Sequence, residues 1–99
     1  MKKDKLASYI NFSIKSGDVI FGYDNIFSAR KKPILVIYDL TLSNKMIEKL
    51  KYYCDMQKIK ILPLENLILS DIIKRDNCKV LAFLNINLSK AIENELLNQ

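Results

Sequence analysis

The sequence of 99 residues contains no histidine, two glycines, two prolines and two cysteines, and these scarcities exclude several kinds of site. Without histidine, the commonest general base and the commonest metal ligand are missing, which rules out histidine-based triads and most zinc sites. Two glycines are too few for a Walker loop, a dinucleotide-binding glycine loop or a nucleophile elbow. The cysteines, Cys54 and Cys78, are isolated, and we expect both to be small core residues.

Long apolar runs are also absent, and none approaches the roughly 20 residues that a membrane-spanning helix needs. The opening segment MKKDKLASYINFS lacks the continuous apolar core of a signal peptide. Hydrophobic residues make up 49% of the chain and charged residues 27%, which is typical of a globular protein. We therefore expect a single domain, residues 1–99, in the cytoplasm.

Charge is plentiful and unbalanced, with 16 Lys and Arg against 11 Asp and Glu, which gives a net charge of +5. This excess suits an anionic partner, but a solvated basic surface has the same composition. Lys45, Lys49 and Lys51 are expected to form such a solvated helix face.

The hydrophobic pattern predicts helices that alternate with strands. Two apolar runs, PILVIYD at 33–39 and KVLAFLNI at 79–86, are typical of strands buried on both faces of a sheet. The alternation indicates an α/β protein, a three-layer α/β/α sandwich around a small four-stranded sheet that is mostly parallel or mixed. The predicted helices cover residues 5–15, about 24–31, about 44–57, 66–74 and about 88–97, and the other predicted strands cover 19–21 and 58–64.

Polar residues mark where these helices begin and end. Ser43 or Asn44 is expected to cap the third helix, and Asn87 the last one. Asp24 or Asn25 is expected to cap the short second helix, which would continue to about Lys31. The cluster Arg30–Lys32 would then lie at the C-terminus of that helix, where the helix dipole favours cations.

Four segments in this order match landmarks of a known family: KSGDVIFGYDNIF, ILVIYD, KLKYYC and LSDIIKRDNCKVLAFLN. Over roughly residues 5–97 the chain resembles the kink-turn-binding ribosomal protein superfamily, and most closely its small bacterial YlxQ-type members. The resemblance implies an α/β/α sandwich that binds sharply bent RNA, such as ribosomal RNA, as a monomer. It also implies possible ribosomal protein partners, no catalysis and no cofactor or metal.

The family grips RNA through a Gly-x-Asn-Glu-x-x-Lys pattern at the start of the second helix, with a loop before the last strand packed beside it. Gly22 stands at the family glycine, Asp24 at the asparagine, Asn25 at the glutamate and Ser28 at the lysine. Asp18 replaces a cation that usually precedes this segment. In the second loop, Ser70 and Lys74 stand where glycines are usual, and Arg75, Asp76 and Asn77 stand where an apolar contact is common.

Each candidate residue has an expected role. Backbone amides near Gly22 face phosphates, Asn25 contacts a base edge or sugar, and the cations of Arg30–Lys32 contact phosphates in place of the missing lysine. The second loop closes the other side of the site. The candidate RNA-binding residues are Gly22, Tyr23, Asp24, Asn25, Ser28, Arg30, Lys31, Lys32, Lys74, Arg75 and Asn77.

Two alternatives remain open. An enzyme is suggested by Asp39, which ends a buried strand as a phosphoacceptor aspartate would, but no acidic pair follows any predicted strand to hold a cation. We expect Asp39 to cap or turn the chain before Ser43. The second alternative is a degenerate family member that acts as a protein-interaction module without kink-turn specificity, in which IKRDNCK at 73–79 and Tyr52–Tyr53 form the surface.

The two tyrosines also suit a helix edge, with one ring inward and the other half exposed. RNA binding predicts that Arg30–Lys32 and residues 74–77 converge on one patch, whereas an interaction module predicts an exposed apolar patch there.

Overall fold

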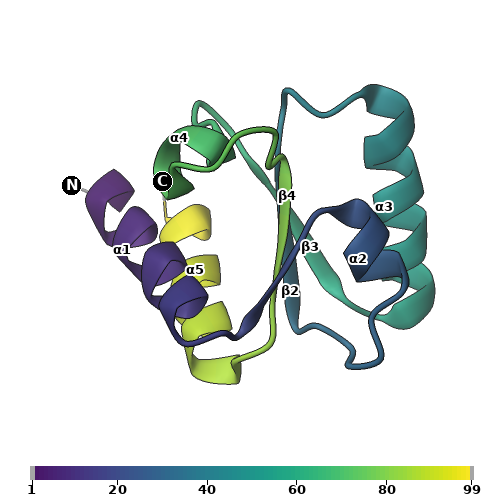
Figure 1. Ribbon diagram of the computed structural model, residues 1–99, viewed down its shortest axis with the longest axis horizontal. Coiled ribbons are helices and arrows are strands. Elements are labelled where there is room, and N and C mark those ends of the chain that lie inside the picture. Colours follow the sequence, from purple (N-terminus) through teal and green to yellow (C-terminus); the bar gives the residue numbers. More distant parts are fainter. Residues whose placement is uncertain (1, 99) are drawn as a thin grey trace.

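The protein folds as an α/β sandwich whose elements alternate as the sequence predicts (Figure 1). The computed structural model describes residues 2–98, with side chains from residue 4 onward. The elements are α1 (Lys2–Lys15), β1 (Val19–Phe21), α2 (Tyr23–Phe27), β2 (Leu35–Asp39), α3 (Asn44–Gln57), β3 (Lys60–Leu64), α4 (Leu69–Ile73), β4 (Val80–Phe83) and α5 (Ile86–Leu97).

The four strands form one mixed sheet in the order β1-β4-β2-β3. Strand β2 pairs in parallel with β3, and β4 runs antiparallel to both of its neighbours, β1 and β2. The direction of β4 follows from the preceding chain: residues 65–79 hold only the five-residue helix α4, which is too short to carry the chain back past β3. Strand β4 therefore starts at the end of the sheet where β3 finishes, on the other side of β2, and runs in the opposite direction.

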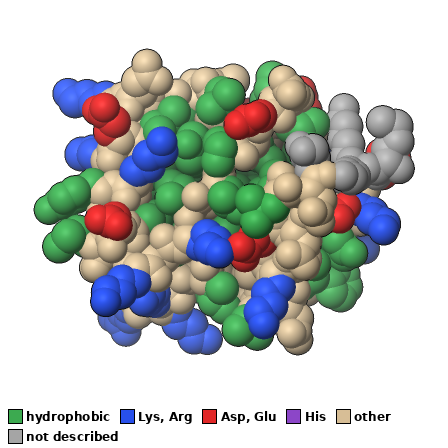
Figure 2. Space-filling model, turned by 180° about the vertical axis from the view of Figure 1, so that it is seen from behind, with side chains coloured by type: hydrophobic (Ala, Val, Ile, Leu, Met, Phe, Trp, Pro, Cys, Tyr) green, Lys and Arg blue, Asp and Glu red, His purple; other side chains and the backbone are tan. Residues whose placement is uncertain are grey.

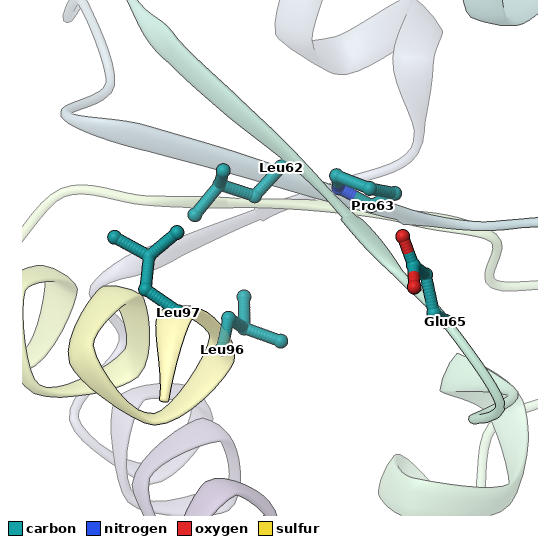
Figure 3. A pocket seen from close by; sticks show the side chains of 5 residues that line it. All are labelled: Leu62, Pro63, Glu65, Leu96 and Leu97. Carbon is teal, nitrogen blue, oxygen red and sulfur yellow. The ribbon is translucent and has the colours of Figure 1, made fainter. Parts of the chain in front are cut away.

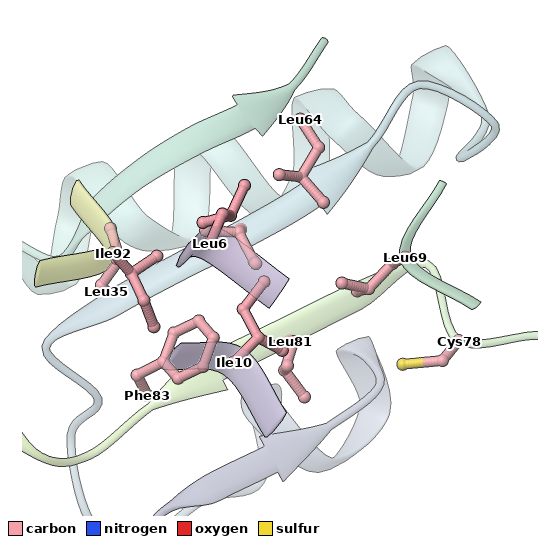
Figure 4. Packing of buried hydrophobic residues seen from close by; sticks show 10 residues of the cluster. Leu6, Ile10, Leu35, Leu64, Leu69, Cys78, Leu81, Phe83 and Ile92 are labelled. Carbon is pink, nitrogen blue, oxygen red and sulfur yellow. The ribbon is translucent and has the colours of Figure 1, made fainter. Parts of the chain in front are cut away.

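Two apolar clusters cover the two faces of the sheet. Because side chains alternate along a strand, Leu35 and Ile37 of β2 face one cluster while Val36 and Tyr38 face the other. The first cluster packs α1, α4 and α5 against the sheet (Figure 4), and the second packs α2 and α3. All residues of β2 and β4 are buried, as predicted for central strands.

Side-chain caps fix the ends of α3 and α5. Ser43 Oγ accepts a hydrogen bond from the N–H of Met46 at 3.2 Å, which confirms one of the two expected caps of α3. The expected cap of α5 at Asn87 is wrong, because Asn85 Oδ1 accepts the N–H of Leu88 at 3.0 Å and the helix starts at Ile86.

Helix α2 is shorter than predicted and has no side-chain cap. It begins directly after Gly22, whose φ of 79° is a conformation that glycine adopts readily, and it ends at Phe27. The cluster Arg30–Lys32 therefore lies in a loop and not at a helix end. The end of this loop is held in place by two features: Pro33 is buried, and the N–H of Ile34 donates to the carbonyl of Phe83 at 2.8 Å.

The loops lie at two opposite ends of the strands, which we call the upper and lower rims after their places in Figure 1. Strand register defines them, because Leu35 pairs with Phe83 at one end and Tyr38 with Val80 at the other. The upper rim comprises Gly22 and residues 40–43, 65–68 and 74–79. The lower rim comprises residues 16–18, 28–34, 58–59 and 84–85.

No helix among residues 2–98 combines the length and the apolar character needed to cross a membrane.

Candidate functional site

The upper rim carries a groove between α2, α3 and the loop that precedes β4. Its volume is about 310 Å³. It is lined by Tyr23, Leu42, Ser43, Met46, Asn77 and Lys79. Only Tyr23 and Asn77 were among the candidates. Leu42 follows β2, Met46 lies on α3 and Lys79 directly precedes β4. No sequence motif indicates that these three residues lie close together.

The loop at 74–79 packs beside the start of α2. The N–H of Gly22 donates to the carbonyl of Val80 at 3.2 Å. The guanidinium carbon of Arg75 lies 4.0 Å from the centre of the Phe21 ring, in a cation–π contact. Gly22, Tyr23, Lys74, Arg75 and Asn77 therefore belong to one rim, although the N–H of Gly22 is already engaged.

Two residues of this loop adopt left-handed backbone conformations. Lys74 ends α4 with a φ of 58°, and Asn77 has a φ of 62°. Asparagine tolerates this region, whereas a lysine there costs about 1 kcal/mol or more. Lys74 thus holds a conformation that a glycine would adopt at a lower cost.

A buried carboxylate holds the upper rim together. Asp39, at the end of β2, has no exposed surface, and its Oδ2 accepts the N–H of Leu69 at 2.8 Å. Its Oδ1 accepts the backbone N–H of Thr41 at 3.0 Å and also the hydroxyl of Thr41. The expected turn at Asp39 is confirmed, and the same carboxylate also caps α4, 30 positions along the chain.

The polar side chains of α2 are partly engaged within the helix. Asn25 Nδ2 donates to the carbonyl of Phe21 at 2.8 Å, and Ser28 Oγ donates to the carbonyl of Asp24 at 3.1 Å. The carboxylate of Asp24 is exposed in the first turn. One hydrogen of the Asn25 amide is therefore engaged, which leaves its second N–H and its amide oxygen for a contact with a ligand.

The expected convergence of Arg30–Lys32 with residues 74–77 is wrong. Arg30–Lys32 precede β2 on the lower rim, whereas residues 74–77 precede β4 on the upper rim. Because β2 and β4 are antiparallel, the loops that enter them lie at opposite ends of the sheet. Asp18 also lies on the lower rim, where its carbonyl accepts the N–H of Leu84 at 2.8 Å.

Aromatic packing fixes the position of Tyr23. The rings of Tyr23 and Phe27 have centroids 6.3 Å apart, and Phe27 meets Tyr53 edge to face at 5.1 Å. Tyr53 also donates its hydroxyl to the carbonyl of Ile26 at 3.4 Å, so its ring points inward as expected. Tyr52 is exposed over 69% of its surface, more than the expected half.

Neither cysteine is arranged as a nucleophile or a metal ligand. Both are buried and free, as expected. Burial raises the pKa of the Cys54 thiol to about 11 and also raises the pKa of Cys78, so both thiols stay protonated at neutral pH. Among the described residues, no three acidic, cysteine or histidine side chains group closely enough to hold a metal ion.

A smaller pocket of about 180 Å³ lies between β3 and the end of α5 (Figure 3). It is lined by Leu62, Pro63, Glu65, Leu96 and Leu97. Leu62 and Leu97 point toward one another across it, and Glu65 is its one charged residue (Figure 3). None of the predicted site residues belongs to it.

Comparison with known proteins adds information on the fold. No protein-family model matches the chain, and no curated protein matches it. A solved structure, described as that of a protein with unknown function from Bacillus halodurans C, is similar, with a TM-score of 0.84 and 17% sequence identity. The match covers 93% of this chain and 96% of that one, so the whole α/β sandwich is shared.

Proposed function

We propose that the protein binds structured, kink-turn-like RNA through the upper-rim groove, as a non-catalytic cytoplasmic component that acts on ribosomal or ribosome-associated RNA. The observation that carries the proposal is the meeting of Tyr23, Asn77 and Lys79 in one groove. Arg75, from the same loop as Asn77, stacks on Phe21, which packs toward the other face of the sheet. An aromatic ring, an amide, a cation and a planar guanidinium are the groups that proteins use on unpaired nucleotides.

The chemistry of the groove suits an unstacked base. A volume of about 310 Å³ lies at the lower end of the range for small-molecule sites, and a single nucleobase is a ligand of that scale. Tyr23, Leu42 and Met46 line the groove and supply apolar contact. Asn77 offers both a donor and an acceptor to a base edge, and Lys79 offers charge to a phosphate.

Arg75 is the most specific element of the proposed site. One face of its guanidinium rests on Phe21, its side chain is exposed, and it has no ion-pair partner among the side chains described. The other face and the N–H donors remain available for a base or a phosphate. Packing on Phe21 orders the side chain before RNA arrives, which reduces the entropy cost of binding.

Charge alone is a weak attraction at this rim. Its loops carry Lys74, Arg75 and Lys79 against the carboxylates of Glu65 and Asp76. Such a near-balance gives little non-specific attraction for phosphates, so affinity must come from shape, stacking and hydrogen bonds. The proposal therefore predicts a preference for bent RNA that persists when salt is raised.

The test compares a labelled kink-turn RNA with a plain duplex of equal length at 50 and 200 mM salt. We expect tighter binding of the bent RNA at both concentrations, and at least a tenfold loss of that preference in Tyr23→Ala combined with Asn77→Ala. Lys45→Ala combined with Lys49→Ala serves as control, because both lysines are exposed on α3. Equal binding of both RNAs that disappears at high salt would contradict the proposal.

A second candidate function, a protein-interaction module, is favoured by two exposed apolar side chains on the same rim. Leu40 is 59% exposed and Ile68 is 43% exposed, and each adjoins one end of the hydrogen bond between Asp39 and Leu69. This function predicts that Leu40→Ser with Ile68→Ser abolishes binding to purified ribosomal proteins, while Arg75→Lys leaves it intact. The first proposal is supported if Arg75→Lys weakens RNA binding and the double variant Leu40→Ser with Ile68→Ser leaves RNA binding unchanged.

A further inference from the structure

The loop at residues 28–34 carries three adjacent cations on the rim opposite to the groove. We propose that Arg30, Lys31 and Lys32 form a second RNA contact, which binds the phosphate backbone of a duplex arm extending from the element held in the groove. The inference rests on the proposed function, because it assigns an additional part of the RNA to a different surface of the same protein.

The separation of the two surfaces follows from the sheet. Strand β2 spans five residues between the rims, and at about 3.3 Å per residue the loops at its two ends lie roughly 17 Å apart. A DNA duplex rises by about 3.4 Å per base pair and the A-form RNA helix rises by less, so an RNA arm needs at least about five base pairs to cover that distance. A shorter RNA fills the groove without reaching the lower rim.

The three cations have no competing role in the fold. All are exposed, and the one ion pair among the described side chains joins Lys60 to Glu93. The loop itself is anchored at both ends, by the N–H of Ala29 on the carbonyl of Ile26 at 3.3 Å and by the N–H of Ile34 on Phe83. Because the loop is anchored at both ends and its cations have no ion-pair partner among the described side chains, an anionic ligand can bind there with little loss of loop entropy.

The lower rim as a whole has a strong excess of cations. Its loops hold Arg30, Lys31, Lys32 and Lys58 against the single carboxylate of Asp18. Figure 2 shows Lys and Arg side chains gathered along the lower edge of the molecule, seen from behind. No aromatic side chain lies in these loops to stack on a base, so the surface suits a backbone of phosphates and carries no means of reading a sequence.

The experiment uses the full chain and three RNAs: a kink-turn with a three-base-pair arm, the same kink-turn with a ten-base-pair arm, and a plain duplex. Affinities are measured at 50 and 200 mM salt for the wild type and for Arg30→Ala/Lys31→Ala/Lys32→Ala. A matched variant, Lys45→Ala/Lys49→Ala/Lys51→Ala, removes the same charge from the exposed face of α3. Melting temperatures confirm that all three proteins fold.

We expect the long arm to strengthen binding by the wild type and the α3 variant, and to add nothing for the loop variant. Each phosphate contact adds about one to the slope of log affinity against log salt, so two or three contacts add about 2 to 3. In the wild type, the gain in affinity from the long arm should therefore fall roughly 15- to 60-fold between 50 and 200 mM salt. With the short arm, the loop variant and the wild type should bind alike.

The outcomes separate the two proposals. If the wild type prefers bent RNA but the long arm helps the loop variant equally, the second contact is refuted and the groove stands. Equal losses in the two triple variants would show an effect of net charge, and this also refutes it. If the wild type does not prefer bent RNA, the groove proposal fails. The plain duplex then tests the second contact by itself: weaker binding by the loop variant but not by the α3 variant supports the contact, and equal binding refutes it.

Discussion

The left-handed conformation of Lys74 gives a prediction that separates stability from RNA affinity. Lys74 and Lys58 end α4 and α3 in nearly the same backbone conformation, with φ of 58° in both and ψ of 40° and 45°. Both side chains are exposed, and both carry one charge. Changing each to glycine therefore removes the same charge and relieves the same strain, on opposite rims.

The size of the effect follows from two opposing terms. A non-glycine residue in this region costs about 1–2 kcal/mol, and glycine removes that cost. Glycine also adds freedom to the unfolded chain, which costs roughly 0.5–1 kcal/mol on folding. We expect a net stabilisation of about 0.5–1 kcal/mol for each variant, which for a domain of this size raises the melting temperature by roughly 2–8 °C.

Thermal unfolding and titration with a short-armed kink-turn RNA test both parts of the prediction. Lys58→Gly should melt higher and bind this RNA unchanged, because residue 58 lies on the lower rim. Lys74→Gly should melt higher and bind it more weakly, with a salt slope reduced by about one. A fall in melting temperature in either variant would refute the strain argument, and unchanged affinity in Lys74→Gly would remove that lysine from the RNA site.

Three more predictions follow from single contacts. Asp39→Asn should lower the free energy of unfolding in urea by about 2–3 kcal/mol, because an amide nitrogen then faces a buried N–H, whereas the exposed Asp71→Asn should change it by less than about 0.5 kcal/mol. Arg75→Lys should weaken binding of short-armed bent RNA by about tenfold at equal charge, and Arg30→Lys should not. The pKa of Cys54, raised from 9.0 to about 11, favours the folded state fully below pH 9. Urea titrations should therefore show a loss of stability between pH 9 and 11 that is smaller by about 3 kcal/mol in Cys54→Ala than in the wild type, since Cys78 contributes to both.

Most of the fold could be predicted from local patterns. Apart from Asp39, the residues of β2 and β4 are apolar because both strands are covered on both faces, and such runs are easy to recognise. Ser43 could be expected as a cap because its hydroxyl precedes a long amphipathic segment. The cap at Asn85 was missed, because Ile86 continues the apolar run although it is the exposed first residue of α5.

The site was only partly predictable, and strand direction explains the difference. Residues 28–34 enter β2 and residues 74–79 enter β4, so the two loops would meet if these strands were parallel. They are antiparallel because α4, with five residues, does not carry the chain across the sheet. No local pattern specifies this direction. The contact of Arg75 with Phe21 depends on this strand direction and could not be predicted from local patterns either. The expectation that Gly22 and Asn77 belong to one site came from the family resemblance alone.

Splitting the cations between two rims changes how the basic charge of the protein should act. At the upper rim, cations and carboxylates nearly cancel, so a preference for RNA there depends on stacking and hydrogen bonds that salt screens weakly. At the lower rim, the proposed contacts of the cations with phosphates should depend steeply on salt. A salt titration with a long-armed RNA should therefore resolve two contributions, one that disappears by a few hundred millimolar and one that persists. If log affinity instead falls linearly with log salt until no binding is detected, net charge alone accounts for the affinity. The groove then contributes no recognition.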